Sequence, residues 1–311
     1  MVKQILVPIL SLLVIFSSCK KKNTDVQTST ANLIFKFKFD STQIRLNSTG
    51  GVSSILATNA AMNPIMNKMS AHYVEITPSA FTGLGAGAVL YRAAEVATGG
   101  ANAIDFSKAV LAGNNEMFLS VPIKNITPGN YEYLRVSVGY QNLDVKFHLD
   151  TTINIPPAGA TLISQDFPTT IAGFIGFNSY ISTFNIKTQP LVVNANKLQG
   201  FWASESSGTI AGFPFNNVQS GQAPANATTV VNPIFASSPI PQGSCLVTGA
   251  FANGNKLNIT GTETKDIVVV VSMSTKKSFE WKDTNGNGKW DPTKGESVVD
   301  MGLRGMIPYI Q

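Results

Sequence analysis

Short apolar runs that alternate with polar residues constrain this chain to a β fold. The clearest example spans residues 31–39, where Leu33, Phe35, Phe37 and Phe39 share one side and Lys36 lies on the other. Alternation with a period of two predicts a half-buried strand. Similar short runs recur between Gly, Pro and Asn turns, and no convincing amphipathic helix occurs. The sequence predicts an all-β, antiparallel β-sandwich, as one large domain or two abutting sandwiches.

The same patterns suggest how the chain is divided. The run at 156–160, PPAGA, is the best internal boundary. It separates an expected N-terminal β-sandwich over 31–157 from a C-terminal β region over 158–311. The continuously apolar run Ile267–Val271 predicts a strand at the centre of a sheet.

Two stretches give weaker signals. Residues 57–69 are rich in Ala, Met and Asn, which predicts a short helix or an irregular segment. Residues 206–255 contain no charged side chain and several prolines. We expect them to form long loops with one or two short strands, and long loops in compact domains are usually functional or disordered.

The N-terminus indicates export and lipid attachment. The apolar run Ile5–Phe16 is too short for an ordinary transmembrane helix but suits a signal peptide. The residues before Cys19 are small and resemble a bacterial lipobox. The sequence therefore predicts a signal peptide over 1–18 and a lipidated Cys19 at the start of a flexible tether over 19–30. We expect a lipid anchor in the bacterial outer membrane; the alternative is an ordinary signal peptide with an incidental cysteine.

Charge and cysteine content limit the classes of partner. Of the 23 Lys and Arg residues, four lie in the first 22 positions, which leaves 19 against 18 acidic residues. There is no broad basic surface, so the composition gives no reason to expect nucleic-acid binding. With Cys19 lipidated, Cys245 has no partner for a disulfide, and we expect a buried, inert thiol.

The stretch 283–296, DTNGNGKWDPTKGE, gathers oxygen-bearing side chains at metal-ligand spacing. Calcium takes six to eight oxygens from carboxylates, amides and carbonyls. The predicted ligands are the side chains of Asp283, Asn285, Asn287, Asp291 and Glu296 and the carbonyl of Lys289. Gly286 and Gly288 allow the positive φ that curls such a loop. Because Lys294 stands where an EF-hand has Glu, the loop more closely resembles the DxNxNG…GE calcium loops of bacterial surface β-domains. The alternative is a polar hairpin.

Two tryptophans lie beside the predicted ligands. We expect Trp281 and Trp290 to be core aromatics that hold the loop against a sheet. A second possibility is a carbohydrate platform that uses Trp202, Trp281 or Trp290 together with the charge-free loops.

Several runs resemble a known family. The strand order of MbnP-like β-sandwich lipoproteins of Bacteroidota resembles the order of three runs here, Ser70–Ile76, Ala103–Phe106 and Pro128–Gly139. The end of the chain, Asp300–Met306, resembles the ending of related uncharacterised lipoproteins. The resemblance implies a β-sandwich for the first half of the chain. The family is associated with copper binding, but its ligands cannot be matched to positions here.

The two histidines, His72 and His148, leave a copper or zinc site open if they combine with an acid such as Glu75 or Asp150. The alternative is that each is an ordinary strand residue. No Ser-His-Asp arrangement or phosphate-binding loop has support, so no catalytic residue is predicted.

Together these patterns favour a non-enzymatic lipoprotein of the cell envelope. We expect a binding or scaffolding module with a calcium-stabilised loop, acting on a protein or glycan partner. A copper-handling protein and a glycan-binding surface lipoprotein are the alternatives.

Overall fold

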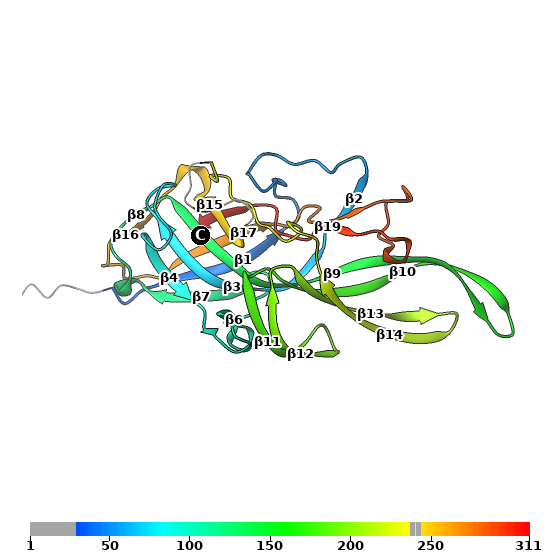
Figure 1. Ribbon diagram of the computed structural model, residues 1–311. Coiled ribbons are helices and arrows are strands. Elements are labelled where there is room, and N and C mark those ends of the chain that lie inside the picture. Colours follow the sequence, from blue (N-terminus) through cyan, green and yellow to red (C-terminus); the bar gives the residue numbers. More distant parts are fainter. Residues whose placement is uncertain (1–28, 237–239, 241–243) are drawn as a thin grey trace, which may run out of the picture.

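The computed structural model describes residues 29–236, 240 and 244–311, and these residues form an all-β fold (Figure 1). The strands are β1 (Asn32–Asp40), β2 (Asn59–Met62), β3 (Ile65–Thr77), β4 (Ala88–Arg92), β5 (Glu95–Val96), β6 (Ala103–Asp105), β7 (Met117–Pro122), β8 (Gly129–Tyr131), β9 (Tyr133–Ile155), β10 (Gly159–Phe174), β11 (Asn178–Asn185), β12 (Pro190–Leu198), β13 (Phe201–Ile210), β14 (Phe213–Gln222), β15 (Leu246–Ala250), β16 (Leu257–Ile259), β17 (Ile267–Ser274), β18 (Phe279–Lys282), β19 (Val298–Asp300) and β20 (Met306–Ile310). Four short 3-10 helices connect them: η1 (Phe106–Lys108), η2 (Ile123–Asn125), η3 (Ala252–Gly254) and η4 (Pro292–Lys294).

The predicted signal peptide, Cys19 and the tether up to residue 28 lie outside the described residues. Within the described part of the chain, no helix has the length and apolar character needed to cross a membrane. Ser29, which the sequence places in the tether, already belongs to the fold. It is buried, and its hydroxyl donates a hydrogen bond to the Glu263 carbonyl at 2.7 Å.

Two sheets pack face to face to form the main sandwich. One has the order β20-β17-β1-β7, and the other has the order β14-β13-β10-β9-β3-β4, with β15 also paired to β9. The pairing is mostly antiparallel, but β1 and β17 run parallel. The sandwich fold predicted from the sequence is therefore confirmed.

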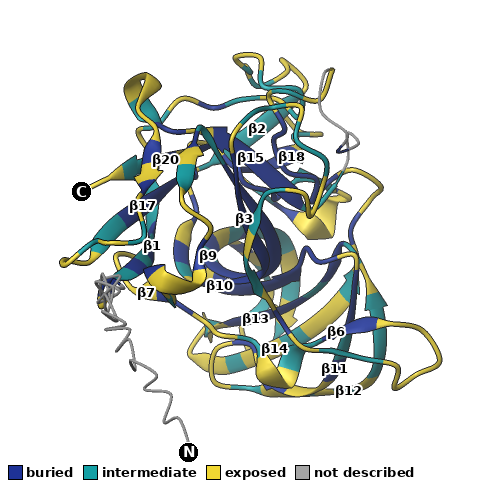
Figure 2. Ribbon diagram, turned by 90° about the vertical axis from the view of Figure 1, so that its left-hand side faces the viewer, coloured by how far each residue is buried: buried dark blue, intermediate teal, exposed yellow. Residues whose placement is uncertain are grey.

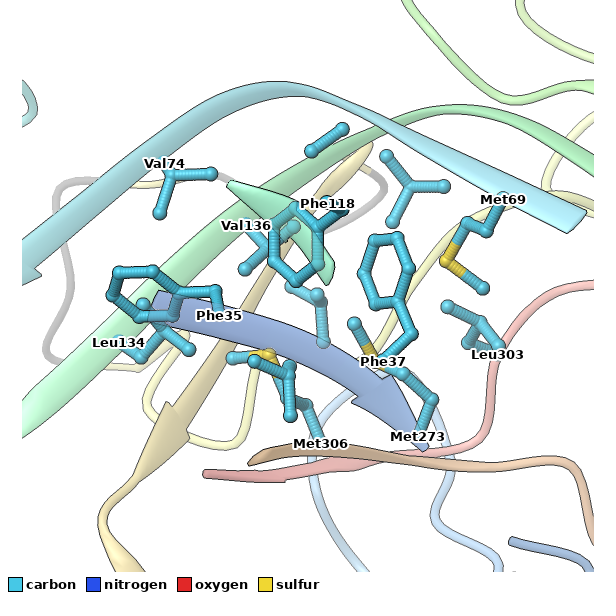
Figure 3. Packing of buried hydrophobic residues seen from close by; sticks show 14 of the residues in the cluster. Phe35, Phe37, Met69, Val74, Phe118, Leu134, Val136, Met273, Leu303 and Met306 are labelled. Atoms are coloured by element: carbon cyan, nitrogen blue, oxygen red, sulfur yellow. The ribbon is translucent and has the colours of Figure 1, made fainter. Parts of the chain in front are cut away.

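The core lies where β1 crosses β3 and β9. Phe35 and Phe37 project from β1 toward Val74 and Val136 on the opposite sheet (Figure 3). Phe37 stacks on Phe118, with 3.8 Å between the ring centroids. Burying such aromatic side chains supplies much of the hydrophobic driving force for folding. Figure 2 shows the buried residues concentrated on the strands where the sheets meet.

Strand predictions from periodicity are confirmed where the signal is strong. The alternating run 31–39 corresponds to β1, whose Leu33, Phe35 and Phe37 are fully buried. The apolar run Ile267–Val271 lies in β17, which has β1 on one side and β20 on the other, so it is central as predicted.

One local expectation is wrong, and a second holds only in part. Residues 57–69 form neither a helix nor an irregular segment but β2 and the start of β3. The charge-free segment contains more strand than expected, because residues 206–210 of β13 and all of β14 form most of a hairpin, whereas the described residues from 223 to 245 form no strand, as expected of a long loop. β14 is the edge strand of its sheet, and an edge accommodates Pro214, whose missing N–H would leave a gap in a central strand.

The expected boundary at 156–160 is the turn of the hairpin that joins β9 to β10. Ile155 pairs with Gly159 next to this turn, and the pairing continues as far as Tyr140 with Phe174. The largest buried cluster contains Leu33 and Val136 from before this turn and Val271 and Met306 from after it. The ranges 31–157 and 158–311 thus share one core. A smaller cluster lies beneath β11, around Phe174.

Candidate functional site

The 283–296 loop joins β18 to β19 and docks on the free edge of β9. The strand β3 pairs with β9 only as far as Asp144, so the N–H groups farther along that edge need other partners. The N–H of His148 donates to the Trp290 carbonyl at 2.6 Å, and the N–H of Asp150 donates to Asp291 Oδ2 at 3.2 Å. Figure 1 shows the loop in orange-red beside the long β9 and β10 strands.

At the tip of the loop, the predicted ligand oxygens accept hydrogen bonds from backbone N–H groups of the loop itself. The Asp283 carboxylate accepts hydrogen bonds from the N–H groups of Asn287 at 3.1 Å and Gly288 at 2.9 Å. The side-chain oxygens of Asn285 and Asn287 accept from the N–H groups two residues later, at 3.0 and 2.7 Å. Gly286 and Gly288 have φ values of 71° and 69°, as the sequence predicts.

The other two acidic residues close the loop from within. Glu296 accepts hydrogen bonds from the N–H of Thr284 at 3.2 Å and from that of Asp291 at 2.7 Å. Asp291 caps η4 by accepting from the N–H of Thr293 at 3.0 Å, besides its bond to Asp150. Both carboxylates are buried. Each carboxylate oxygen has two lone pairs, so these bonds do not exhaust the capacity of the loop to bind a cation.

The carboxylate and amide oxygens of the loop are therefore of the kind that a hard cation binds. In the part of the chain that the structure describes, no three His, Cys, Asp or Glu side chains are grouped so as to hold a metal ion. A calcium ion in this loop would thus need amide oxygens from Asn285 and Asn287 and the Lys289 carbonyl as well as carboxylates.

A buried charge cluster supports the base of the loop. Glu280 on β18 pairs with Arg45, and Asp300 on β19 pairs with Arg304 at 2.8 Å. Arg45 and Asp300 are 3.7 Å apart, which links the two pairs. Burial raises the pKa of the Asp300 carboxyl to about 6, although Arg304 and Arg45 oppose that rise. The two strands that flank the loop are held together by these four side chains.

The structure does not bring the two histidines together. His72 lies on β3 at an irregularity next to Ala71, which pairs with Val138 of β9, whereas His148 is ten residues farther along β9, on the order of 30 Å away along the strand. His72 Nε2 is 2.8 Å from Glu95, and His148 Nδ1 is 2.7 Å from Asp166. Burial lowers the pKa of His72, against the effect of Glu95. Each histidine thus has its own carboxylate.

Glu75, one of the two acids named as possible metal partners, is engaged elsewhere. Glu75 is completely buried and pairs with Arg135 at 3.2 Å.

Cys245 is half-buried, with its Sγ 3.3 Å from the Ser137 hydroxyl, and no catalytic base contacts it in the described structure.

Beside the loop lies a pocket of about 550 Å³. Its floor is one face of the sheet formed by β9, β10, β13 and β14. Thr169, Ser206 and Asn217 lie side by side across three strands, as do Ile171, Ser204 and Gln219 in the next row. Thr169, Ser204 and Ser206 are small, so they leave a space that larger side chains would fill.

The loop covers this floor. Trp290 of the loop, Pro292 of η4, Val298 of β19 and Met301 line the opposite side of the pocket. Trp290 is fixed in place because its ring packs edge-on against Phe279 and its Nε1 donates to the Glu296 carbonyl at 3.3 Å. The predicted calcium loop is therefore one wall of a pocket.

The tryptophans occupy different environments. Trp281 is 1% exposed, as expected of a core aromatic. Trp202 and Trp290 are half-buried, and both line the pocket. The indole of Trp202 lies over Gly221 of the paired strand, where a Cβ atom would come within 2.8 Å of the ring. Sequence reasoning singled out these two tryptophans but missed the pocket. The one sequence feature that could have indicated the pocket is the alternation of Trp202, Ser204 and Ser206 along a strand.

Comparison with known proteins gives no relative: no family model, no curated protein and no solved structure matches this chain.

Proposed function

We propose that the chain is a non-enzymatic, lipid-anchored binding module of the bacterial cell envelope, with a 283–296 loop that is stabilised by calcium. The observation that carries the proposal is the conformation of the loop. Two glycines at positive φ curl it, and the side-chain oxygens of Asp283, Asn285 and Asn287 gather at its tip. The tip of the loop, residues 283–288, has no apolar side chain to bury, so an ion is a physically reasonable source of order there.

Calcium is expected to raise the melting temperature of the protein. An ion that binds only the folded state stabilises it by RT ln(1 + [L]/Kd), about 2.7 kcal/mol at a hundredfold excess over Kd. The measurement is a thermal melt in calcium and in EDTA. The upward shift should vanish in Asp283→Ala, which removes a carboxylate from the tip of the loop.

The matched control for this melt is Asp105→Ala. Asp105 accepts a hydrogen bond from the N–H of Ser107 at 3.0 Å, so its loss also removes a local backbone cap, but outside the loop. This variant should keep the full calcium shift. Equal melting temperatures of the wild type in calcium and EDTA would refute the calcium part of the proposal.

The anchor predicts that Cys19→Ala moves the protein from the membrane to the soluble fraction. Two or more acyl chains bind a membrane stably, whereas the unmodified chain has no such attachment. The measurement is membrane fractionation of bacteria that express the wild type or Cys19→Ala, with Cys245→Ala as the cysteine control. Equal membrane association of wild type and Cys19→Ala would contradict the anchor.

A further inference from the structure

We propose that the pocket between the 283–296 loop and the β13–β14 hairpin binds one small, uncharged, ring-containing apolar molecule. The proposal deepens the binding role proposed above, on which it rests, by giving that role a site and a class of ligand. At about 550 Å³ the pocket falls within the range of roughly 300–1,000 Å³ that is typical of small-molecule sites.

The floor of the pocket is built to leave space. The residues of β13 that line it are Trp202, Ser204, Ser206 and Ile210, so two of the four are serines, and Gly221 lies opposite Trp202 on β14. In a closed sandwich the inward face of a central strand carries large apolar side chains that meet the opposite layer. Here the serines are more than nine-tenths buried, yet they do not fill the volume above them.

The lining favours an apolar, ring-containing ligand. Four aromatic side chains reach the pocket from four different segments: Phe147, Trp202, Phe215 and Trp290. Flat aromatic surfaces on both the floor and the cover suit a ligand with rings, because rings stack on aromatic faces and gain contact at little cost in conformational entropy. Ile171 and Met301 add aliphatic surface.

The charges around the pocket favour a neutral ligand. Among the described residues that line it, none is Lys, Arg or His, so an anionic group would enter without a counter-ion. Glu296 is the one ionisable residue of the lining, and its two carboxylate oxygens accept backbone N–H groups from Thr284 and Asp291. A cationic ligand would find only this one carboxylate as a counter-ion, and that carboxylate is already hydrogen-bonded within the loop.

Polar groups are available at the rim. Asn217 and Gln219 lie exposed on β14, and neither side chain makes a hydrogen bond to another described residue. In the floor, by contrast, the hydroxyls of Thr169 and Ser206 bond to each other at 2.8 Å. The ligand thus meets free hydrogen-bonding groups at the mouth and an apolar interior.

The test uses two probes that share one ring system. N-phenyl-1-naphthylamine is neutral, and 8-anilinonaphthalene-1-sulfonate adds a sulfonate to the same skeleton. Each is titrated into residues 20–311, which include the whole described fold, with fluorescence and calorimetry as readouts. Saturable binding of one neutral dye per chain is expected, at least tenfold tighter than binding of the sulfonate.

Three variants locate the binding site. Ser204→Phe fills the floor and Trp202→Ala removes an aromatic wall, and each should weaken binding of the neutral dye at least tenfold. Phe213→Ala is the matched control, because Phe213 is an exposed aromatic residue on the same hairpin that does not line the pocket, and it should bind like the wild type. Trp202→Ala alters a half-exposed position, so it keeps the test decisive if Ser204→Phe fails to fold.

Other results would overturn the proposal. An absence of saturable binding, or an unchanged dye affinity in a folded Trp202→Ala variant, would do so. Tighter binding of the sulfonate dye than of the neutral dye would also contradict it. Displacement of the neutral dye by micromolar maltohexaose would indicate a sugar site instead. Repeating the titration in EDTA separates the two proposals. If calcium has no effect on the melt but the dye binds as predicted, the pocket assignment stands without the calcium site.

Discussion

Replacing Arg135 with methionine is expected to lower the free energy of unfolding by about 3–5 kcal/mol, because it leaves a buried carboxylate without its cation. The side chains of Arg135 and Glu75 are both 0% exposed. Glu75 also accepts hydrogen bonds from the N–H groups of Gly85 at 3.1 Å and Gly87 at 2.8 Å, and Arg135 donates to the Thr82 carbonyl at 2.7 Å. The pair therefore fastens a surface turn to the centre of the large sheet. Equilibrium unfolding in urea measures the loss.

A double-mutant cycle isolates the pair. Glu75→Gln combined with Arg135→Met removes both charges, so the double variant should be more stable than the sum of the single losses predicts. Arg92→Met is the matched control, because Arg92 is 63% exposed and lies 3.9 Å from its carboxylate partner. Exposed pairs contribute about 0–1 kcal/mol. A loss below about 1 kcal/mol in Arg135→Met would mean that the pair is dispensable.

The sequence predicted elements whose own residues carry a clear pattern of apolar positions. β1 alternates apolar and polar residues, and β17 begins with the continuous apolar run Ile267–Val271, so their burial follows from the local sequence pattern. The curl of the 283–296 loop follows from the local preferences of Gly286 and Gly288. Features of this kind depend on residues that are close in sequence, which is why a single sequence is enough to find them.

Other features depend on partners that are distant in the chain. β14 carries polar residues on both faces, and it is a strand because it pairs with β13 along its whole length. The Glu75–Arg135 pair joins residues that are 60 positions apart. The pocket requires small residues on β13 to face a loop that begins about eighty positions later, at Asp283. No local pattern specifies such a meeting.

The second large effect is expected at the base of the 283–296 loop. Glu280→Gln keeps the shape of the side chain but removes its charge, and it should lower the free energy of unfolding by about 3–5 kcal/mol. Glu280 and Arg45 are both buried, and Nε and Nη1 of Arg45 already have no hydrogen-bond partner. Without Glu280, the nearest carboxylate to Arg45 is Asp300, at 3.7 Å. Urea unfolding again gives the magnitude.

This substitution should also weaken ligand binding in the pocket. Glu280 pairs with Asp300 across β18 and β19, and β19 carries Val298 of the pocket lining, so a loosened base weakens the cover as well as the fold. Glu132→Gln is the matched control, since Glu132 and its partner Lys256 are 39% and 53% exposed, and it should change stability by no more than about 1 kcal/mol. Equal losses in the two variants would show that the buried cluster is no more important than a surface pair. A larger loss in Glu280→Gln, with weaker binding of the neutral dye, would tie the charge cluster to the pocket through the strand they share.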